Sequence, residues 1–193
     1  MVPEARMKGS IEVIVGCMSS GKSEELIRRL RRASIAKQGT IVFKPAHDVR
    51  TDNVTIASRD GKTHGAVTVA RAADIPPLVT ERHCVVGLDE AQFFDAGIVT
   101  VANALVDRGV RVIVAGLDTD FRGHPFGEVP HLMAIADTVT KLQAVCMKCG
   151  KPSATRSQLL ISLPSGDLAS PDFIGGDEKY EARCRDCHEP PAG

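Results

Sequence analysis

The alternation of apolar and polar stretches along the chain predicts strands separated by helices. Five short apolar runs are rich in β-branched residues and bounded by Gly, Asp or Pro, which is typical of strands; they cover residues 11–15, 40–44, 84–88, 111–117 and 138–145. Three segments with helical periodicity lie between them, at residues 23–37, 96–108 and 130–136. Strands that are apolar throughout and alternate with helices favour an α/β fold with a parallel sheet covered on both faces.

Two segments depart from this pattern. Residues 48–70 are polar, with weak strand patterns at residues 54–58 and 66–70. After residue 145 the chain turns to Cys, Gly, Pro and Ser without helical periodicity. We therefore expect a flexible N-terminus over residues 1–9, an α/β domain over 10–145 and a small second domain over 146–193.

A glycine-rich motif lies where the first predicted strand meets the first predicted helix. The run "GCMSSGKS" fits G-x-x-x-x-G-K-[ST], in which loop amides and the helix N-terminus bind phosphate. Lys22 would neutralise the β- and γ-phosphates, and the Ser23 hydroxyl would bind Mg²⁺. A glycine turn that matches by chance is the alternative. The predicted ATP- and Mg²⁺-binding residues of this loop are Gly16, Cys17, Met18, Ser19, Ser20, Gly21, Lys22 and Ser23.

A second motif, "CVVGLDEAQFF", ends an apolar strand in two carboxylates. Asp89 matches the position that holds Mg²⁺ in nucleotide-binding folds of this kind, which makes the predicted domain a nucleotide-binding one. At the carboxyl end of the strand, Glu90 can face the acceptor and take a proton from a substrate hydroxyl or from water. The alternative is that Glu90 only caps the following turn.

Four of the six cysteines form two C-x-x-C pairs. Four thiolates predict a closed, structural zinc site; its ligands would be Cys146, Cys149, Cys184 and Cys187. A redox role is the weaker interpretation, since one pair would suffice, and His188 is an alternative ligand to Cys187. We expect Cys17 and Cys84 to be small apolar fillers.

Charge and hydropathy exclude other classes. The 193 residues carry a formal net charge of zero, which gives no support to nucleic-acid or membrane binding. The sequence shows neither a signal-peptide pattern nor an apolar run long enough to span a bilayer, so we expect a cytoplasmic protein without a membrane partner. The arginines at positions 28, 29, 31 and 32 are expected on a solvated or subunit-facing helix.

Together these motifs carry a family resemblance. The runs "GCMSSGKSEELIRRLRR", "FKPAHDVR", "GLDEAQFF", "VIVAGLDTDFRGHPFG", "KLQAVCMKCG" and "IGGDEKYEARCRDC" resemble, in order and over residues 10–187, the zinc-containing thymidine kinases of bacteria and animal cytosol. The resemblance implies a P-loop NTPase-type parallel sheet flanked by helices, with a small C-terminal zinc-binding lasso domain. It implies transfer of the γ-phosphoryl group of ATP to the 5′-hydroxyl of thymidine, with deoxyuridine as a second acceptor, in salvage of DNA precursors.

The resemblance also assigns roles to residues. Glu90 matches the general base, and Arg50 resembles an arginine beside the transferring phosphate, so the catalytic residues implied are Glu90, Lys22 and Arg50. A homotetramer and feedback inhibition by thymidine triphosphate are implied as well. Thr155 and the run "IGGDEKY", which ends in Tyr180, resemble the family's lasso, a loop that grips the base of the nucleoside. The thymidine-binding residues implied are Met18, Phe93, Leu117, Phe121, Thr155, Phe173, Ile174, Gly175 and Tyr180.

Two departures and two rivals accompany this resemblance. Cys17 stands where the family often has Pro, and Ser19 where it often has Phe, so the outer wall of the loop differs. A P-loop ATPase, with Glu90 activating water, would share the first two motifs. A zinc-ribbon nucleic-acid module would share the cysteines, but their surroundings lack the basic and aromatic residues that such modules use.

Overall fold

The chain forms one large and two small sheets with three α-helices in its described part. The computed structural model describes residues 9–46, 55–57, 63–161 and 179–190. The strands are β1 (Ser10–Val15), β2 (Gly39–Pro45), β3 (Thr55–Ala57), β4 (Thr63–Gly65), β5 (Val67–Val69), β6 (His83–Leu88), β7 (Arg111–Gly116), β8 (Thr138–Lys141), β9 (Arg156–Leu159) and β10 (Tyr180–Arg183). The helices are α1 (Lys22–Ile35), α2 (Gly97–Asp107) and α3 (Val129–Ile135), with 3-10 turns η1 (Ala72–Asp74), η2 (Pro76–Leu78) and η3 (Ala91–Phe93).

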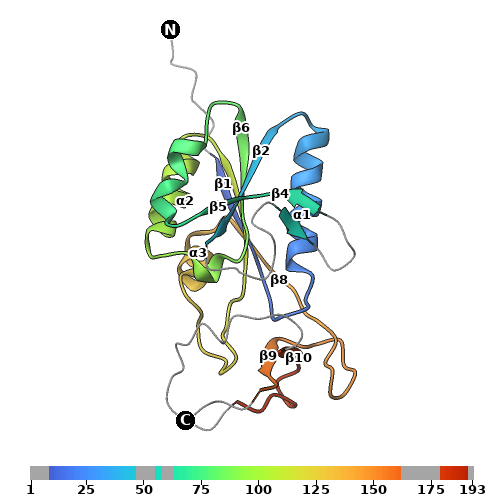
Figure 1. Cartoon of the computed structure of the whole chain (residues 1–193). Helices are drawn as coiled ribbons and strands as arrows, with labels where there is room; N and C mark the ends of the chain where they lie inside the picture. The colour runs from blue at the N-terminus through green and yellow to red at the C-terminus, as the bar shows by residue number, and fades with distance from the viewer. Residues whose placement is uncertain (1–8, 47–54, 58–62, 162–178, 191–193) are drawn as a thin grey trace.

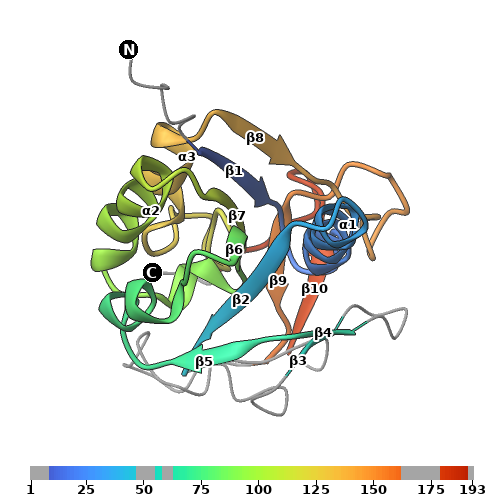
Figure 2. The same ribbon diagram turned by 90° about the horizontal axis from the view of Figure 1, so that it is seen from above.

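The main sheet has six strands in the order β5-β2-β6-β7-β1-β8 (Figure 2). Each of its strand pairs is parallel. Strand β7 lies between β1 and β6, so the carboxyl ends of these three strands meet at one edge of the sheet. That edge carries both the glycine-rich loop after β1 and the carboxylates after β6. The predicted α/β class and parallel sheet are confirmed.

Helices cover both faces of this sheet, α1 on one side and α2 with α3 on the other (Figures 1 and 2). On the α1 side, Leu26 and Leu30 pack with Ile14 and Ile113 in a fully buried cluster. A larger cluster under α2 and α3 includes Ile98 of α2. Burying one such side chain contributes about 1.5–3 kcal/mol. Double coverage explains why the central strands are apolar throughout.

The predicted elements appear with shifted ends, and β8 is clearly shorter than predicted. It stops at Lys141, although the apolar pattern continues to residue 145. The Leu142 N–H still donates to Val15 O at 2.8 Å, but Ala144 already pairs with Ala154. The chain leaves the sheet because its next backbone partner belongs to the C-terminal part. In the polar segment, β3 and β5 lie within the two weak strand patterns, and β4 was not predicted.

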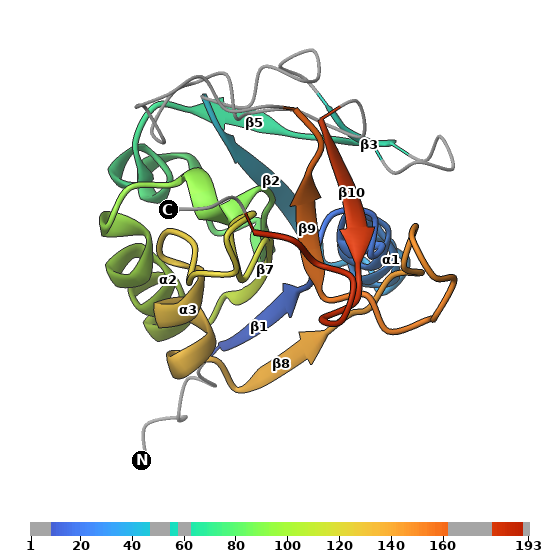
Figure 3. The same cartoon turned by 90° about the horizontal axis from the view of Figure 1, so that it is seen from below.

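The C-terminal part forms an antiparallel pair of strands, β9 and β10. This pair lies beyond the N-terminal end of α1, beneath the main sheet in Figure 1 and in front of it in Figure 3. It thus faces the edge at which the glycine-rich loop lies. The division into domains at residue 145 stays a prediction. Within the described ranges, no helix combines the length and apolar character that crossing a bilayer requires.

The arginines of α1 are only partly solvated as predicted. Arg28 is exposed and pairs with Glu25 at 2.6 Å. Arg29 is instead largely buried against the sheet, where it forms ion pairs at 2.8 Å with both Glu25 and Glu12. Arg111 completes this network by bonding Glu12 at 2.6 Å. The network links α1 to β1 and β7.

Candidate active site

The loop after β1 folds tightly back on itself. A Cβ atom on Gly16 would lie 2.6 Å from Ser20 Oγ and 2.7 Å from Leu142 O, so only glycine fits there. Gly21, the residue before α1, has a φ of 87°, a left-handed conformation that favours glycine. The two glycines of the motif therefore have different structural roles: Gly16 allows close packing of the loop, and Gly21 allows the turn into α1.

Lys22 points back into this loop. Its Nζ donates a hydrogen bond to Cys17 O at 2.8 Å. Desolvation lowers the pKa of Lys22, and the nearby carboxylates of Glu90 and Asp89 partly offset this effect. In the described part of the chain, Ser20 Oγ is buried without a hydrogen-bond partner. A half-buried ammonium and an unpaired hydroxyl in a glycine loop fit the oxygens of a nucleotide phosphate.

Asp89 follows β6 directly and is 4% exposed. Its N–H donates to Phe43 O at 3.0 Å, which fixes the backbone at the strand end. Burial and the neighbouring Glu90 raise the pKa of Asp89 to about 7, although Lys44 opposes the shift. A buried carboxylate beside a second carboxylate is a favourable place for a divalent cation. Asp89 therefore has the chemistry of a Mg²⁺ ligand, and the roles of Asp89 and Ser23 in binding Mg²⁺ stay predictions.

Glu90 adopts an unusual backbone conformation, with φ 53° and ψ 44°. It precedes η3 but makes no side-chain capping bond to that turn, so the capping alternative is not observed. Its Oε2 instead accepts a hydrogen bond from Gln92 Nε2 at 2.6 Å. Both Glu90 and Asp89 interact electrostatically with Lys22, so the two carboxylates lie near the glycine-rich loop.

Gln92 is a site residue that the sequence analysis missed. The side chain is buried at 4% exposure, and its Oε1 accepts a hydrogen bond from Leu117 N at 3.0 Å. It therefore connects the loop after β6 to the end of β7. A glutamine two residues after a carboxylate gives no sequence signal for such a link, because the partner lies 25 residues away.

Three of the predicted thymidine-binding residues come together. Met18 packs against a buried cluster formed by Phe121, Leu159 and Tyr180. The rings of Phe121 and Tyr180 are 6.5 Å apart and tilted by 40°. Leu159, the last residue of β9, was not predicted as part of the site. Its apolar side chain was its only sequence signal. The cluster joins the glycine-rich loop, the segment after β7 and the C-terminal strands.

The other predicted pocket residues lie apart from this cluster. Phe93 stacks edge-on against Phe126, with ring centroids 5.6 Å apart. Leu117 is buried, and Thr155 precedes β9, where its N–H donates to Arg183 O at 3.1 Å. The remaining predictions fall outside the described residues, so their roles stay predictions; they are Arg50, Phe173, Ile174 and Gly175.

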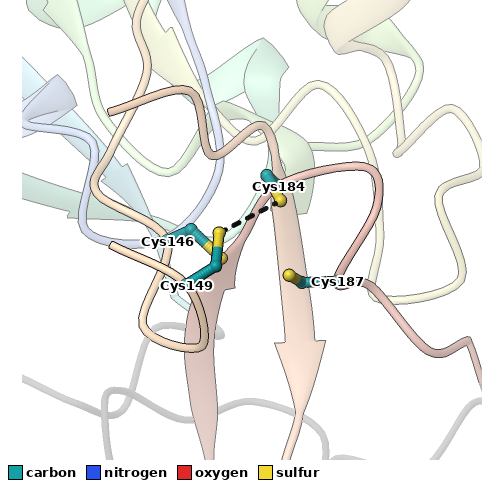
Figure 4. Close-up of side chains that lie close together, drawn as sticks. All are labelled: Cys146, Cys149, Cys184 and Cys187. Carbon is teal, nitrogen blue, oxygen red and sulfur yellow. Dashed lines mark hydrogen bonds between the residues drawn. The ribbon is translucent and has the colours of Figure 1, made fainter. Parts of the chain in front are cut away.

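The four predicted zinc ligands converge (Figure 4). The Sγ atoms of Cys146, Cys149, Cys184 and Cys187 all lie within 4.8 Å of one another, and those of Cys149 and Cys184 are 3.7 Å apart. A tetrahedral zinc site with Zn–S bonds of about 2.3 Å places its sulfur atoms about 3.8 Å apart. The cluster therefore fits a structural zinc ion.

Backbone contacts shape this cluster. Gly150 N donates to Cys146 O at 2.8 Å, and His188 N donates to Cys184 O at 3.0 Å, so each C-x-x-C pair closes a tight turn. Although burial acts to raise it, backbone hydrogen bonds bring the pKa of Cys146 to about 6, which favours the thiolate. The His188 ring contacts Phe121 O at 2.8 Å. It is thus occupied elsewhere, and the four-cysteine set is the better one.

The remaining cysteines differ from each other. Cys17 is buried against Cys146 and Cys184, and its Sγ donates to Ala154 O at 3.3 Å, so it is the expected apolar filler. Cys84 is exposed on β6, and its prediction as a filler was wrong, because it lies at the start of the strand where neither face is fully covered.

Two comparisons with known proteins gave matches. The chain is similar to the X-ray structure of the Legionella pneumophila ATPase DotB at 15% sequence identity and a TM-score of 0.42. That match covers 66% of this chain and 34% of the other, so this chain spans about a third of that protein's length. A family model described as thymidine kinase matches residues 9–188. The chain belongs to the thymidine kinase family.

Proposed function

We propose that this protein phosphorylates the 5′-hydroxyl of thymidine with ATP, giving dTMP and ADP, and accepts deoxyuridine as a second substrate. The observation that carries the proposal is the family match, which spans nearly the whole chain. The geometry supports it, because Lys22 interacts electrostatically with both Asp89 and Glu90, as one site requires. The reaction serves the salvage of DNA precursors.

The residues divide the work of phosphoryl transfer. The loop of residues 16–23 holds the ATP phosphates, and Lys22 neutralises charge on the β- and γ-phosphates. Ser23 and Asp89 would hold Mg²⁺, which would offset the negative charge of the phosphates. Glu90 accepts the 5′-hydroxyl proton while that oxygen bonds the γ-phosphorus and the bond to the ADP oxygen breaks. Arg50 stabilises the charge that develops on the transferring group.

The C-terminal part supplies the nucleoside site in this proposal. Zinc on the four cysteines fixes the base of the lasso, and the lasso residues predicted above close over the thymine. The cluster of Met18, Phe121 and Tyr180 supports this arrangement, since it joins the ATP loop to β10 in the described structure. Closure would exclude water, which competes with the nucleoside for the phosphoryl group.

Assembly, regulation and location extend the proposal. The resemblance to zinc-containing thymidine kinases supports a homotetramer, feedback inhibition by thymidine triphosphate and a cytoplasmic location. We propose neither nucleic acid nor a membrane as a partner. A P-loop ATPase remains the rival function, since Glu90 could equally activate water.

One experiment separates the two functions. ADP release by the purified protein with ATP and Mg²⁺ is measured with thymidine, with deoxyuridine and without a nucleoside. We expect thymidine to raise the rate strongly and dTMP to appear in step with ADP. Equal ADP release without nucleoside would identify water as the acceptor and overturn the kinase proposal.

A further inference from the structure

The amide of Gln92 connects the proposed base to the strand beside it. Its Nε2 donates to Glu90 Oε2 at 2.6 Å, and its Oε1 accepts from Leu117 N at 3.0 Å. Gln92 is 4% exposed; its bond to Leu117 is buried, and its bond to Glu90 is partly buried. A hydrogen bond to a charged group in such surroundings is short and strong.

The Leu117 bond fixes which way the amide faces. A backbone N–H can only donate, so the amide oxygen must face Leu117 and the NH₂ group must face Glu90. The fit is close: a Cβ atom on Gly116 would lie 3.0 Å from Gln92 Oε1. Rotation of the amide would place donor against donor on one side and acceptor against acceptor on the other. The NH₂ group is therefore held in place for Glu90.

We infer that Gln92 is a positioning residue for phosphoryl transfer, acting through Glu90. This inference rests on the proposed function, in which Glu90 takes the 5′-hydroxyl proton. Glu90 has a left-handed backbone conformation after the strand end, and the Gln92 bond holds one of its carboxylate oxygens in place. The same amide ties this carboxylate to Leu117, a predicted wall of the thymine pocket. Gln92 thus positions the carboxylate of Glu90, the proposed general base, relative to the 5′-hydroxyl of the nucleoside.

Two variants test this role with different chemistry. Gln92→Glu keeps the shape and the acceptor for Leu117 N–H but replaces the donor to Glu90. Gln92→Met keeps the approximate length, removes both bonds and adds no charge. Because misplacing a reacting group by about 1 Å costs about 100-fold, we expect kcat with thymidine to fall by about 10- to 100-fold in both. The KM for ATP should stay within about twofold, since the phosphate loop is untouched.

Coupling to Glu90 distinguishes positioning from a merely structural role. In a Glu90→Gln background, adding Gln92→Met should lower kcat by less than about twofold, because the group through which Gln92 acts is already lost. Gln38→Met, at an exposed glutamine after α1, is the control and should behave like the parent. Thermal melting is followed for every variant, and Gln92→Glu serves if Gln92→Met does not fold.

The inference is overturned if kcat is unchanged in Gln92→Glu, or if the effects of Gln92→Met and Glu90→Gln multiply in the double variant. Failure of the proposed function looks different. In that case the parent itself shows no thymidine-dependent ADP release, whatever residue 92 is.

Discussion

The backbone N–H of Met18 donates a hydrogen bond to Ser157 Oγ at 3.0 Å, joining the glycine-rich loop to β9 across 139 residues of sequence. Ser157 is 2% exposed, and the bond itself is partly buried. The shape of the glycine-rich loop therefore depends on a strand of the C-terminal part. Cys17 of the same loop packs in one buried cluster with Cys146 and Cys184, two of the predicted zinc ligands.

Loss of this bond should loosen the phosphate loop. Ser157→Ala removes the acceptor of this partly buried hydrogen bond, which costs about 0.5–1.5 kcal/mol. We expect a KM for ATP several times higher and a lower melting temperature. Steady-state kinetics and thermal melting check both, with Ser153→Ala, at an exposed serine of the same segment, as the control. Equal kinetics of the two variants would contradict a role for the bond.

Removal of the loop cation should abolish transfer without unfolding the protein. In Lys22→Ala we expect turnover to fall by at least about 100-fold, since no other residue of the motif can neutralise the γ-phosphate. The melting temperature should hold, because desolvation already disfavours the charged form of Lys22. Arg31→Ala, at an exposed cation of α1, is the control. Near-normal turnover of Lys22→Ala would disprove the assignment of the ATP site.

Metal analysis should find one zinc ion per chain, matching the single four-cysteine cluster of the described residues. Cys184→Ser should lose the metal, because one ligand in four is gone, and should open the C-terminal part before the sheet unfolds. Limited proteolysis followed by mass spectrometry locates the opening. Cys84→Ser, at the exposed cysteine of β6, should keep its zinc. Freshly purified, reduced parent protein without zinc would refute the site.

Glu90→Gln should separate chemistry from binding. The amide keeps the size of the side chain but cannot take a proton, so turnover with thymidine should fall by about 10²- to 10⁴-fold. Nucleotide affinity, measured by calorimetry, should change little. Glu81→Gln, at an exposed position, controls for the lost charge. If Glu90→Gln keeps most of the thymidine-dependent rate, the kinase function can stand but another residue must be the base.

Acid should weaken the network between α1 and the sheet. The hydrogen bond from Arg28, together with Arg29 and against the effect of burial, lowers the pKa of Glu25 from near 4.5 to about 2. A depressed pKa means that the stabilisation is present above about pH 4.5 and is lost as the pH falls toward 2. At neutral pH the free energy of unfolding of the parent should exceed that of Glu25→Gln by about 1 kcal/mol, as expected for a partly exposed ion pair.

Denaturant unfolding between pH 7 and pH 3 tests this window. The difference between parent and Glu25→Gln should narrow steadily below about pH 4.5. Glu24→Gln is the control, since Glu24 is exposed and forms no ion pair with any described residue. A difference that stays constant over the range would show that Glu25 stabilises by packing rather than by charge.

Local patterns predicted the strands of the main sheet and the three α-helices, but not β4, β9 or β10. They also predicted the geometry of the glycine-rich loop and of the cysteine cluster. The strands β1, β2, β6 and β7 are covered on both faces, and their sequences are therefore apolar throughout. The β-branched apolar runs predicted them for this reason. The loop residues are contiguous, and the cysteine ligands are a rare residue type in a known spacing. Their convergence could therefore be expected without any knowledge of long-range contacts.

Contacts between distant segments could not be predicted in this way. The Met18–Ser157 and Gln92–Leu117 bonds join ordinary polar groups whose sequences carry no signal for each other. The end of β8 was misjudged for the same reason, because Ala154, rather than any local breaker, draws the chain out of the sheet. Arg29 was likewise expected on a solvated helix face, because its partner Glu12 lies on β1, distant in the sequence.

The left-handed backbone of Glu90 has a consequence for how this protein can evolve. A non-glycine residue in that conformation stores about 1–3 kcal/mol of strain. Glycine at position 90 would relieve the strain, but it would also remove the carboxylate. Selection for thermal stability alone would therefore favour inactive variants at this position. In a library of single variants, Glu90→Gly should therefore be among the substitutions that raise the melting temperature and lower the turnover with thymidine.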